Sequence, residues 1–295
     1  MITELEYKDN NGGLKDILPE KPVLEQVSGG FTFTEGPVWC GDYLLFSDIP
    51  RNRIIRLDNF SDGPEVSTYR RPSGNSNGLT LDKAGRLIVC ESSTRRMTRT
   101  EVDGTITVLA GRYQGKSLNS PNDVVVKSDG AVYFTDPYYV SGNPPPPEEL
   151  GFRGVFRIAP DETLAMLADD FIFPNGLAFS PDESVLYVND TMQRNVRAYD
   201  VNADGLIGNK RTLIEMTGEE PGAPDGMKVD TAGNVYCTGP GGIWVISPDG
   251  THLGTMSFPE MPANLCFGGD GWHALYVTAR TGVYRVTLAA TGIAV

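Results

Sequence analysis

The sequence has few of the residues on which nucleophilic, redox and soft-metal chemistry depend. Its only histidines are His252 and His273, and it has no G-x-S-x-G segment, so a Ser-His-Asp hydrolase of that type is not encoded. The cysteines lie far apart without C-x-x-C spacing, which excludes a zinc knuckle and a redox pair. Their strand context favours reduced, buried thiols that act as small apolar residues at Cys40, Cys90, Cys237 and Cys266.

Long apolar runs and basic clusters are also missing. No stretch approaches the ~18 apolar residues of a membrane span. Residues Met1–Gly13 lack the basic and apolar parts of a secretory leader, so we expect a cytoplasmic protein that does not enter a membrane. With 25 Lys and Arg against 38 Asp and Glu, the net charge is −13, which argues against a nucleic-acid partner.

A short repeated tag is the most informative feature that is present. In each copy a polar residue precedes an apolar strand, and successive tags lie 42, 45, 53, 50 and 39 residues apart. This period is typical of propeller blades. The sequence therefore predicts an all-β, six-bladed β-propeller with four-stranded antiparallel blades around a central channel. The tags start at Glu35, Asn77, Asn122, Asn175, Asp225 and Asn264.

The chain ends are expected to close this ring. Residues 1–20 carry mixed charge and are predicted to be an N-terminal tail, while residues 21–295 form one propeller domain. Because a propeller must leave no free sheet edge, we expect Val23–Val27 to pair beside Val283–Val286. The run Pro144–Pro147 lacks backbone donors, so it is expected in an exposed loop over the channel mouth.

A second set of polar residues is expected near the tags. Within a repeat the tag opens a strand, a turn follows and an alternating run returns, which predicts a hairpin. A hairpin returns to the face it left, so positions 13 to 15 residues after each tag should reach the same mouth. Acidic residues there would attract a cation; alternatively, they cap turns or pair with local arginines. These positions are Asp48, Glu91, Asp136, Asp190, Thr238 and Thr278.

The tag residues themselves offer oxygen ligands. Carboxylates and amide carbonyls suit a hard divalent cation, and Ca²⁺, Mg²⁺ or Mn²⁺ would fit. Zn²⁺ usually recruits His or Cys, which this set lacks. Asn77 and Asn264 occupy the remaining equivalent places and are expected to bind substrate or water. The alternative is structural, because Asn-Gly and Asp-Gly are common turn dipeptides. The candidate metal ligands are Glu35, Asn122, Asn175 and Asp225.

From about Val23 to Val286 the sequence resembles the gluconolactonase family, also called the senescence-marker-protein-30 or regucalcin-like family, of six-bladed propellers. Singly the matching segments are short, and together they are specific. They are Thr34-Glu-Gly-Pro-Val-Trp, Leu44-Leu-Phe-Ser-Asp-Ile-Pro, Ser120-Pro-Asn-Asp-Val-Val-Val, Phe173-Pro-Asn-Gly-Leu-Ala-Phe-Ser and Pro224-Asp-Gly-Met.

The resemblance implies a mononuclear divalent-metal hydrolase that opens a sugar lactone, such as a gluconolactone, to the free acid. It implies Glu35, Asn175 and Asp225 as metal ligands, with Asn122 at the metal or the substrate. Members are associated with calcium, zinc, manganese and magnesium; we expect Ca²⁺, with Zn²⁺, Mn²⁺ or Mg²⁺ as alternatives. Some members carry Arg at the position of Ser120, so an arginine contact to the sugar is not carried over.

In the expected reaction the metal polarises the lactone carbonyl and water is the nucleophile. Asp225 is expected to deprotonate this water as ligand and base, and metal-bound hydroxide is the alternative nucleophile. Loop residues such as Tyr139 and Met192 would shape the pocket. Substrate contacts are expected from Asn77, Asn122, Asn264, Ser120, Asp136, Tyr138 and Asp190.

Two other functions are compatible with the same residues. One is a calcium-dependent phosphotriesterase of the diisopropylfluorophosphatase type, whose propeller has a similar Glu/Asn/Asn/Asp site. The other is a calcium-binding propeller without catalysis. The expected partner is a small sugar lactone, with no nucleic acid and no membrane, and the expected oligomeric state is a monomer or a small homo-oligomer.

Overall fold

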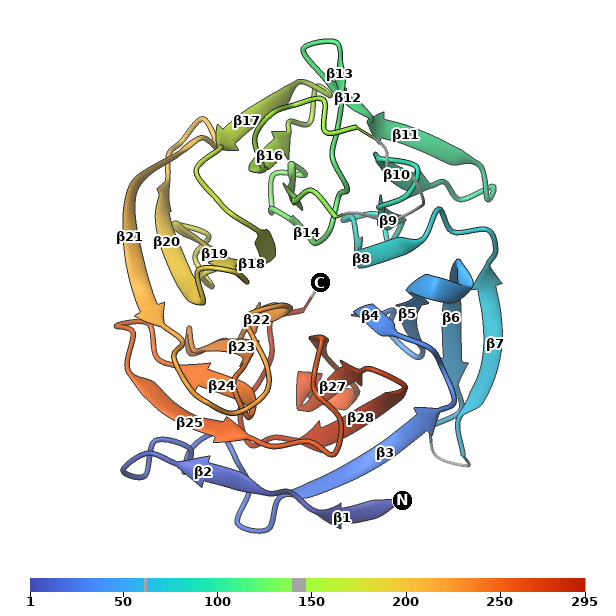
Figure 1. Ribbon diagram of the computed structural model, residues 1–295. Coiled ribbons are helices and arrows are strands. Elements are labelled where there is room, and N and C mark those ends of the chain that lie inside the picture. The colour runs from blue at the N-terminus through green and yellow to red at the C-terminus, as the bar shows by residue number, and fades with distance from the viewer. Residues whose placement is uncertain (61–62, 140–146, 295) are drawn as a thin grey trace.

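The protein is a ring of six antiparallel sheets around a central channel (Figure 1). The structure is a computed structural model, and it describes residues 1–60, 63–139 and 147–294. Each blade has four strands arranged from the channel outward, as the predicted strand-turn-strand pattern requires, and two of the sheets gain a fifth strand described below. The all-β six-bladed propeller predicted from the tag period is therefore confirmed.

The first three blades are built from strands in chain order. A small two-stranded sheet of β12 (Arg112–Tyr113) and β13 (Lys116–Ser117) lies in the chain between blades 2 and 3. Blade 1 contains β4 (Thr34–Trp39), β5 (Leu44–Asp48), β6 (Arg53–Asp58) and β7 (Glu65–Arg70). Blade 2 contains β8 (Ser76–Leu81), β9 (Leu87–Glu91), β10 (Arg96–Thr100) and β11 (Ile106–Ala110). Blade 3 contains β14 (Val124–Val126), β15 (Val132–Asp136), β16 (Gly154–Ile158) and β17 (Leu164–Ala168).

The last three blades include the closure of the ring. Blade 4 contains β18 (Pro174–Phe179), β19 (Val185–Asp190), β20 (Asn195–Val201) and β21 (Ile207–Glu215). Blade 5 contains β22 (Met227–Val229), β23 (Val235–Gly239), β24 (Gly242–Ile246) and β25 (His252–Met256). Blade 6 contains β26 (Asn264–Gly268), β27 (Ala274–Ala279), β28 (Gly282–Thr287) and, from the other end of the chain, β3 (Val23–Gly29). The pairing of β28 with β3 confirms the predicted closure by the two chain ends.

Residues 1–20, which we expected to be a tail, pack on the outside of two blades. Strand β1 (Ile2–Glu4) pairs with β3, and β2 (Tyr7–Asp9) pairs with β25, so each adds a fifth strand (Figure 1). The segment also buries four apolar side chains in the core beneath blades 5 and 6, namely Leu5, Leu14, Ile17 and Leu18. Of the charged residues that suggested a tail, Glu4, Lys8 and Asp9 lie on these added strands, where they are exposed.

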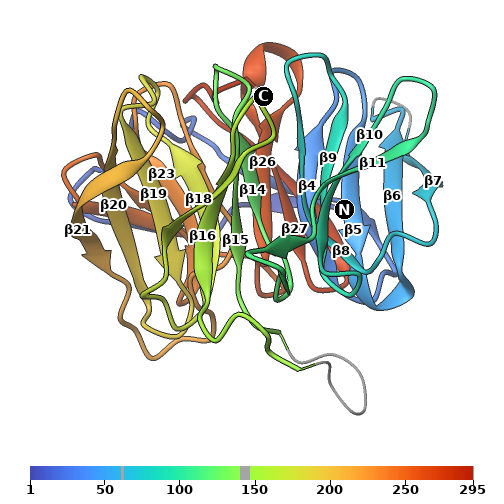
Figure 2. The same ribbon diagram turned by 90° about the horizontal axis from the view of Figure 1, so that it is seen from above.

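The core lies between neighbouring blades rather than in the channel. In one such layer, Val38 and Ile54 of blade 1 pack with Leu79 and Val89 of blade 2. Between blades 6 and 1, the rings of Trp39 and Tyr276 stack with centroids 5.0 Å apart. The strands of adjacent blades run side by side through the thickness of the ring (Figure 2). This packing fixes the inner strands, and hence the tags, relative to one another.

Helices are almost absent. The described residues contain two 3-10 turns, η1 (Ile49–Arg51) and η2 (Asp270–Trp272), and no helix there has the length and hydrophobicity of a membrane span. The four cysteines are free thiols, and Cys90, Cys237 and Cys266 are buried as expected. Cys40 differs from the expectation, because it follows the end of β4 and is only partly buried. The expected proline loop at 144–147 lies almost wholly outside the described residues.

Candidate functional site

The tags are aimed at the channel by irregular pairing of the inner strands. In blades 1, 2 and 4 the register between the first and second strand shifts immediately after the tag residue, between Glu35 and Val38, between Ser76 and Leu79, and between Pro174 and Leu177. An extra residue in one strand bends it and redirects its side chain. Asn122 and Asp225 precede their strands, which begin at Val124 and Met227, although the Asn122 N–H still donates to the Thr135 carbonyl of β15 at 2.9 Å.

Glycine after the tag allows the inner strands to approach closely. The Gly176 N–H donates to the Asp225 carbonyl at 3.0 Å, and a Cβ on Gly176 would lie 2.1 Å from that oxygen. The Gly78 N–H likewise donates to the Asn122 carbonyl at 2.7 Å. Two pairs of successive tags are thus joined by backbone hydrogen bonds, and no larger residue fits at this point of blade 4.

Two predicted carboxylates lie next to each other, and the charge of a third acts on both. Asp225 contacts Glu35 and feels the charge of Asp123. Glu35 is 2 % exposed, and burial followed by the charge of Asp123 raises the pKa of Glu35 to about 7. Burial first, and then Glu35, raise the pKa of Asp225 well above its ordinary value. Like charges this close favour protons or a cation between them.

Two tag residues have a buried amide oxygen without a hydrogen-bond donor, and one of them contacts Asp225. Asn175 contacts Asp225 and donates to Thr191 Oγ1 at 3.0 Å, but its Oδ1 is buried without a donor among the described residues. Asn77 Oδ1 is in the same state. A buried acceptor left unpaired costs about 1–3 kcal/mol, so such an atom calls for a partner.

These donors fit a hard divalent cation. The carboxylates of Glu35 and Asp225 with the unpaired oxygen of Asn175 are the ligand types that Ca²⁺ and Mg²⁺ prefer. Within the part of the chain that the structure describes, no three His, Cys, Asp or Glu side chains are grouped as a metal site, so amide oxygens would have to complete this one. The Asn122 side chain makes no hydrogen bond to another described residue and is 8 % exposed, so it is available as a further oxygen donor.

The acidic residues that follow the tags have a different place from the one expected. Asp136 is fully buried, and its two oxygens accept hydrogen bonds from the backbone N–H groups of Asn119 and Ser120, both at 2.8 Å. Asp48 in blade 1 accepts from the N–H groups of Thr32 and Phe33 at 3.1 and 3.3 Å. Each carboxylate therefore holds the loop that leads into its tag.

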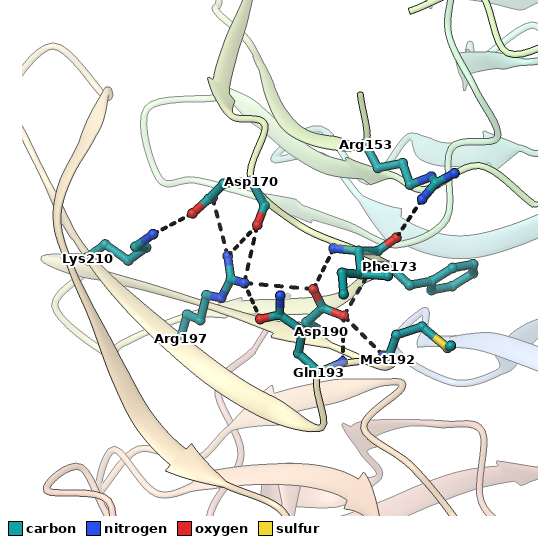
Figure 3. Close-up of polar contacts among 9 residues, drawn as sticks. Arg153, Asp170, Phe173, Asp190, Met192, Gln193, Arg197 and Lys210 are labelled. Carbon is teal, nitrogen blue, oxygen red and sulfur yellow. Dashed lines mark hydrogen bonds and ion pairs between the residues drawn. The ribbon is translucent and has the colours of Figure 1, made fainter. Parts of the chain in front are cut away.

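Asp190 does the same in blade 4 (Figure 3). It accepts from the N–H groups of Ile172 and Phe173, at 2.8 and 3.2 Å, just before Asn175. The N–H groups of Met192 and Gln193 donate to it from the other side, both at 3.0 Å. Because its oxygens are occupied by backbone donors, we withdraw Asp190, and Asp136 for the same reason, from the expected substrate contacts.

Glu91 pairs with arginines instead of the backbone. It is fully buried and receives Arg70, Arg96 at 2.7 Å, Thr94 at 2.5 Å and Thr98 at 2.9 Å. The expected negative rim is thus wrong, and the alternative of turn capping and arginine pairing describes these acids. These carboxylates are buried and paired with N–H groups or arginines, so they do not form a negative surface that would steer a cation.

The remaining expected substrate contacts are divided. Asn264 is 2 % exposed and both ends of its amide are engaged, since its Nδ2 donates to Glu35 at 2.9 Å and its Oδ1 accepts from the Leu265 N–H at 2.8 Å. Asn264 therefore holds Glu35 in place and has no free polar atom for a substrate. Ser120 Oγ lies 3.3 Å from the carbonyl oxygen of Tyr139, and the partly buried Tyr138 lies in the same loop.

Two residues of the cluster were not singled out from the sequence. Asp123 stands where four other tags carry glycine, and that exception was a usable signal. Lys228 lies three residues after Asp225, and its charge acts on both Glu35 and Asp123. The equivalent positions of the other tags are uncharged, namely Val38, Thr80, Val125, Ala178 and Phe267.

Comparisons with known proteins place this arrangement in a family. The chain is 37% identical over 301 residues to the gluconolactonase of Zymomonas mobilis subsp. mobilis, across 92% of this chain and 83% of that protein. It is 30% identical over 259 residues to pentonolactonase XacC of Haloferax volcanii, across 84% and 81%. The solved structure of the gluconolactonase XC5397 from Xanthomonas campestris matches with a TM-score of 0.87 and 32% identity, over 97% of this chain and 95% of that chain. Residues 33–281, which include every tag, match the family described as SMP-30/Gluconolactonase/LRE-like region, and the chain belongs to that family.

Proposed function

We propose that this protein hydrolyses a sugar lactone, such as a gluconolactone, to the free acid at the cluster of Glu35, Asn175 and Asp225. The observation that carries the proposal is the contact between two carboxyls from distant blades beside an amide oxygen that lacks a donor. The gluconolactonase and pentonolactonase relatives support a sugar lactone as the substrate.

A divalent cation, Ca²⁺ in our proposal with Zn²⁺, Mn²⁺ and Mg²⁺ as alternatives, would be held by Glu35, Asn175 and Asp225, with Asn122 as a further donor. When bound it would supply Lewis-acid polarisation of the lactone carbonyl. The two carboxylates balance the charge of such a cation, and their negative charge favours its uptake in a buried site.

Asp225 is the proposed proton acceptor. Its carboxyl is buried beside Glu35 and Asn175, at the place where the lactone and its attacking water would meet. In the proposed reaction a water oxygen bonds to the lactone carbonyl carbon while its proton passes to Asp225. The carbon–oxygen bond of the ring then breaks, and the ring oxygen takes that proton and leaves as a hydroxyl. The product is a hydroxy acid that releases a proton at neutral pH.

The sugar hydroxyls would be bound by amides and by the loop after β15. Asn77 Oδ1 is buried without a hydrogen-bond partner, and the Asn122 amide, in a residue that is 8 % exposed, makes no hydrogen bond to a described residue, so both retain capacity toward a ligand. Ser120 lies two residues before Asn122 in the chain, and Tyr138 lies in the loop after β15. Ser120 Oγ donates to the Tyr139 carbonyl of that loop at 3.3 Å. We propose Asn77 and Asn122 as the principal substrate contacts, since their polar atoms are not committed elsewhere.

The decisive experiment is a lactone panel with pH-stat readout, on protein stripped of metal and resupplied with one divalent ion at a time. We expect Asp225→Asn and Glu35→Gln to lower turnover by at least about 100-fold while the circular dichroism spectrum is retained. The matched control is Asp182→Asn in the exposed turn of the blade 4 hairpin, which should leave turnover unchanged. Wild-type turnover by Asp225→Asn, with metal content verified, contradicts the assignment.

Parallel assays separate the other two functions. Hydrolysis of diisopropyl fluorophosphate without lactone turnover would establish the phosphotriesterase instead. A rise in thermal stability on adding Ca²⁺, with no turnover of any lactone or phosphotriester, would establish a structural ion in a non-catalytic propeller.

A further inference from the structure

The Asn264 side chain is a bridge between two acids. Its Nδ2 donates to Glu35 Oε2 at 2.9 Å and lies 3.5 Å from Asp123 Oδ2. Its orientation is fixed, because Oδ1 accepts from the Leu265 N–H at 2.8 Å. The preceding tag packs closely against it as well, since a Cβ on Gly226 would lie 2.1 Å from Oδ1. Asn264 therefore ties the position of Glu35 to that of Asp123.

The hydrogen bond from Asn264 also determines which oxygen of Glu35 lacks an N–H donor. Oε2 accepts from Asn264 and from the Gly36 N–H at 2.6 Å. Both N–H donors are on this one oxygen, and Oε1 receives none from any described residue. A carboxylate fixed in this way presents its other oxygen in one defined direction.

Asp123 is a charge that the proposed metal does not require. It is 2 % exposed, and its Oδ1 accepts from the Val124 N–H at 2.9 Å. Glu35 and Asp225 already provide two negative charges against a dication, so a third buried carboxylate leaves an excess of one. A buried charge without compensation is costly.

Lys228 supplies the compensating charge. Burial raises the pKa of Asp123, and the positive charge of Lys228 acts in the opposite direction on Asp123 and on Glu35. The ammonium donates to the Met227 carbonyl at 2.9 Å and forms no ion pair within 4.0 Å in the part of the chain described. On its other side, Lys228 lines a cavity of about 300 Å³ together with Val124, Ala178 and Ile293.

We propose that Asp123 and Lys228 form a charge-balanced layer behind the metal ligands, and that Asn264 transmits its position to Glu35. This inference rests on the proposed function in so far as Glu35 and Asp225 bind a dication. Asp123, Lys228 and Asn264 are positioning residues, because they act through Glu35 and through the local field. With this layer in place the cluster has a net charge of two negative units, which matches one dication.

Calcium titration of the metal-stripped protein by calorimetry tests the layer without using activity. Asp123→Asn leaves Lys228 uncompensated, so we expect the Ca²⁺ Kd to rise by about 10-fold. Lys228→Met leaves Asp123 uncompensated, so the Kd should fall by about 10-fold. The double variant should return to within about 3-fold of wild type. Asn264→Ser shortens the bridge and should raise the Kd, as Asp123→Asn does.

Thermal unfolding in excess chelator tests the same pair without any metal. Each single variant leaves one buried charge unpaired, so the double variant should lose less Tm than the sum of the two single losses. Lys127→Met is the matched control, because Lys127 lines the same cavity but pairs with Glu183 at 3.2 Å. It should leave the Ca²⁺ Kd unchanged.

The outcomes separate this inference from the proposed function. Shifts of the Ca²⁺ Kd in the same direction for Asp123→Asn and Lys228→Met, or additive losses of Tm, would overturn the layer. A wild-type protein that binds Ca²⁺ but opens no lactone would overturn the proposed function while opposite shifts still support the layer. A wild-type protein that binds no divalent cation would overturn both.

Discussion

The carboxylate of Asp136 accepts a hydrogen bond from the backbone N–H of Ser120 at 2.8 Å, and this contact holds the loop that presents Asn122. Asp136→Asn replaces one acceptor oxygen with an amino group, which leaves a buried N–H of Asn119 or Ser120 without an acceptor. We expect a loss of about 1–3 kcal/mol in the free energy of unfolding, measured by urea titration near pH 5.

The control for this variant is Asp42→Asn. Asp42 is exposed and has no side-chain hydrogen bond among the described residues, so the change should alter stability by less than about 0.5 kcal/mol. Equal losses in both variants would contradict the role given to Asp136.

The stability of Asp136→Asn should also depend on pH in a defined direction. Burial raises the pKa of Asp136 from 3.8 to about 7, so ionisation of this group opposes folding. The cost is absent below about pH 4 and complete above about pH 7. The deficit of the variant relative to wild type should therefore shrink as the pH rises through this window. Urea titrations at four or five pH values measure it, and a deficit that grows with pH would refute the assignment.

Glu91 should show the opposite dependence. Burial alone would raise its pKa, but hydrogen bonds from Thr94, Arg96 and Arg70 lower the pKa below the ordinary value of 4.5. A lowered folded pKa gives stability that is complete above pH 4.5 and is lost as the pH falls through the folded value. The stability deficit of Glu91→Gln should thus be largest near neutral pH and disappear in acid, as measured by Tm against pH.

The N-terminal segment should contribute to the stability of the whole ring. Leu14 is 1 % exposed and packs over Gly254 of β25, where a Cβ would lie 2.5 Å from Leu14 Cδ1. We expect Leu14→Ala to lower the free energy of unfolding by about 2–5 kcal/mol. Leu206→Ala is the control at a residue that is 41 % exposed, and it should change stability little. A small effect of Leu14→Ala would mean that residues 1–20 behave as the tail first expected.

The architecture was predictable because polar tags and apolar side chains repeat at regular intervals along the sequence. The tag period, the alternating runs and the pairing of Val23–Val27 with the last blade are all visible as apolar patterns. No apolar pattern predicts the strands β1 and β2, because an outer strand is held by backbone hydrogen bonds that any sequence can make. Their few buried leucines are separated by charged residues, so the segment has no clear periodicity.

The site was predictable only in part, for a related reason. Glu35, Asn175 and Asp225 share a register, and register alone brings them to one axis. Asp136 shares a register with its counterparts too, but an acid at the end of a strand gives the same pattern whether it faces the channel or a loop N–H. Only the folded structure distinguishes these cases. Asp123 lies one residue beyond the repeated position, where four other tags carry glycine, so the repeat pattern does not assign it to the site.

Removal of divalent ions should destabilise the protein if the cluster binds one. At a free Ca²⁺ concentration about 100 times the Kd, binding adds about 2.7 kcal/mol to the free energy of unfolding, which corresponds to a rise in Tm of about 5 °C. Scanning calorimetry in chelator and in Ca²⁺ measures the difference. Glu35→Gln should show a much smaller rise, and an undiminished rise in that variant would place the ion elsewhere.

The close contact between Gly176 of blade 4 and the Asp225 carbonyl should affect catalytic activity more than stability. In Gly176→Ala the new methyl group would lie 2.1 Å from the Asp225 carbonyl oxygen, so the inner strands must separate. The hydrogen bond from the Gly176 N–H to that carbonyl then lengthens, and Asp225 moves relative to Asn175. We expect a loss of kcat/KM of at least about 100-fold, because displacement of about 1 Å at a catalytic group has that effect. Gly208→Ala in β21 is the matched control, since its Cβ would meet nothing closer than 4.0 Å. If both variants hydrolyse lactone as the wild type does, the proton acceptor is not held at this junction.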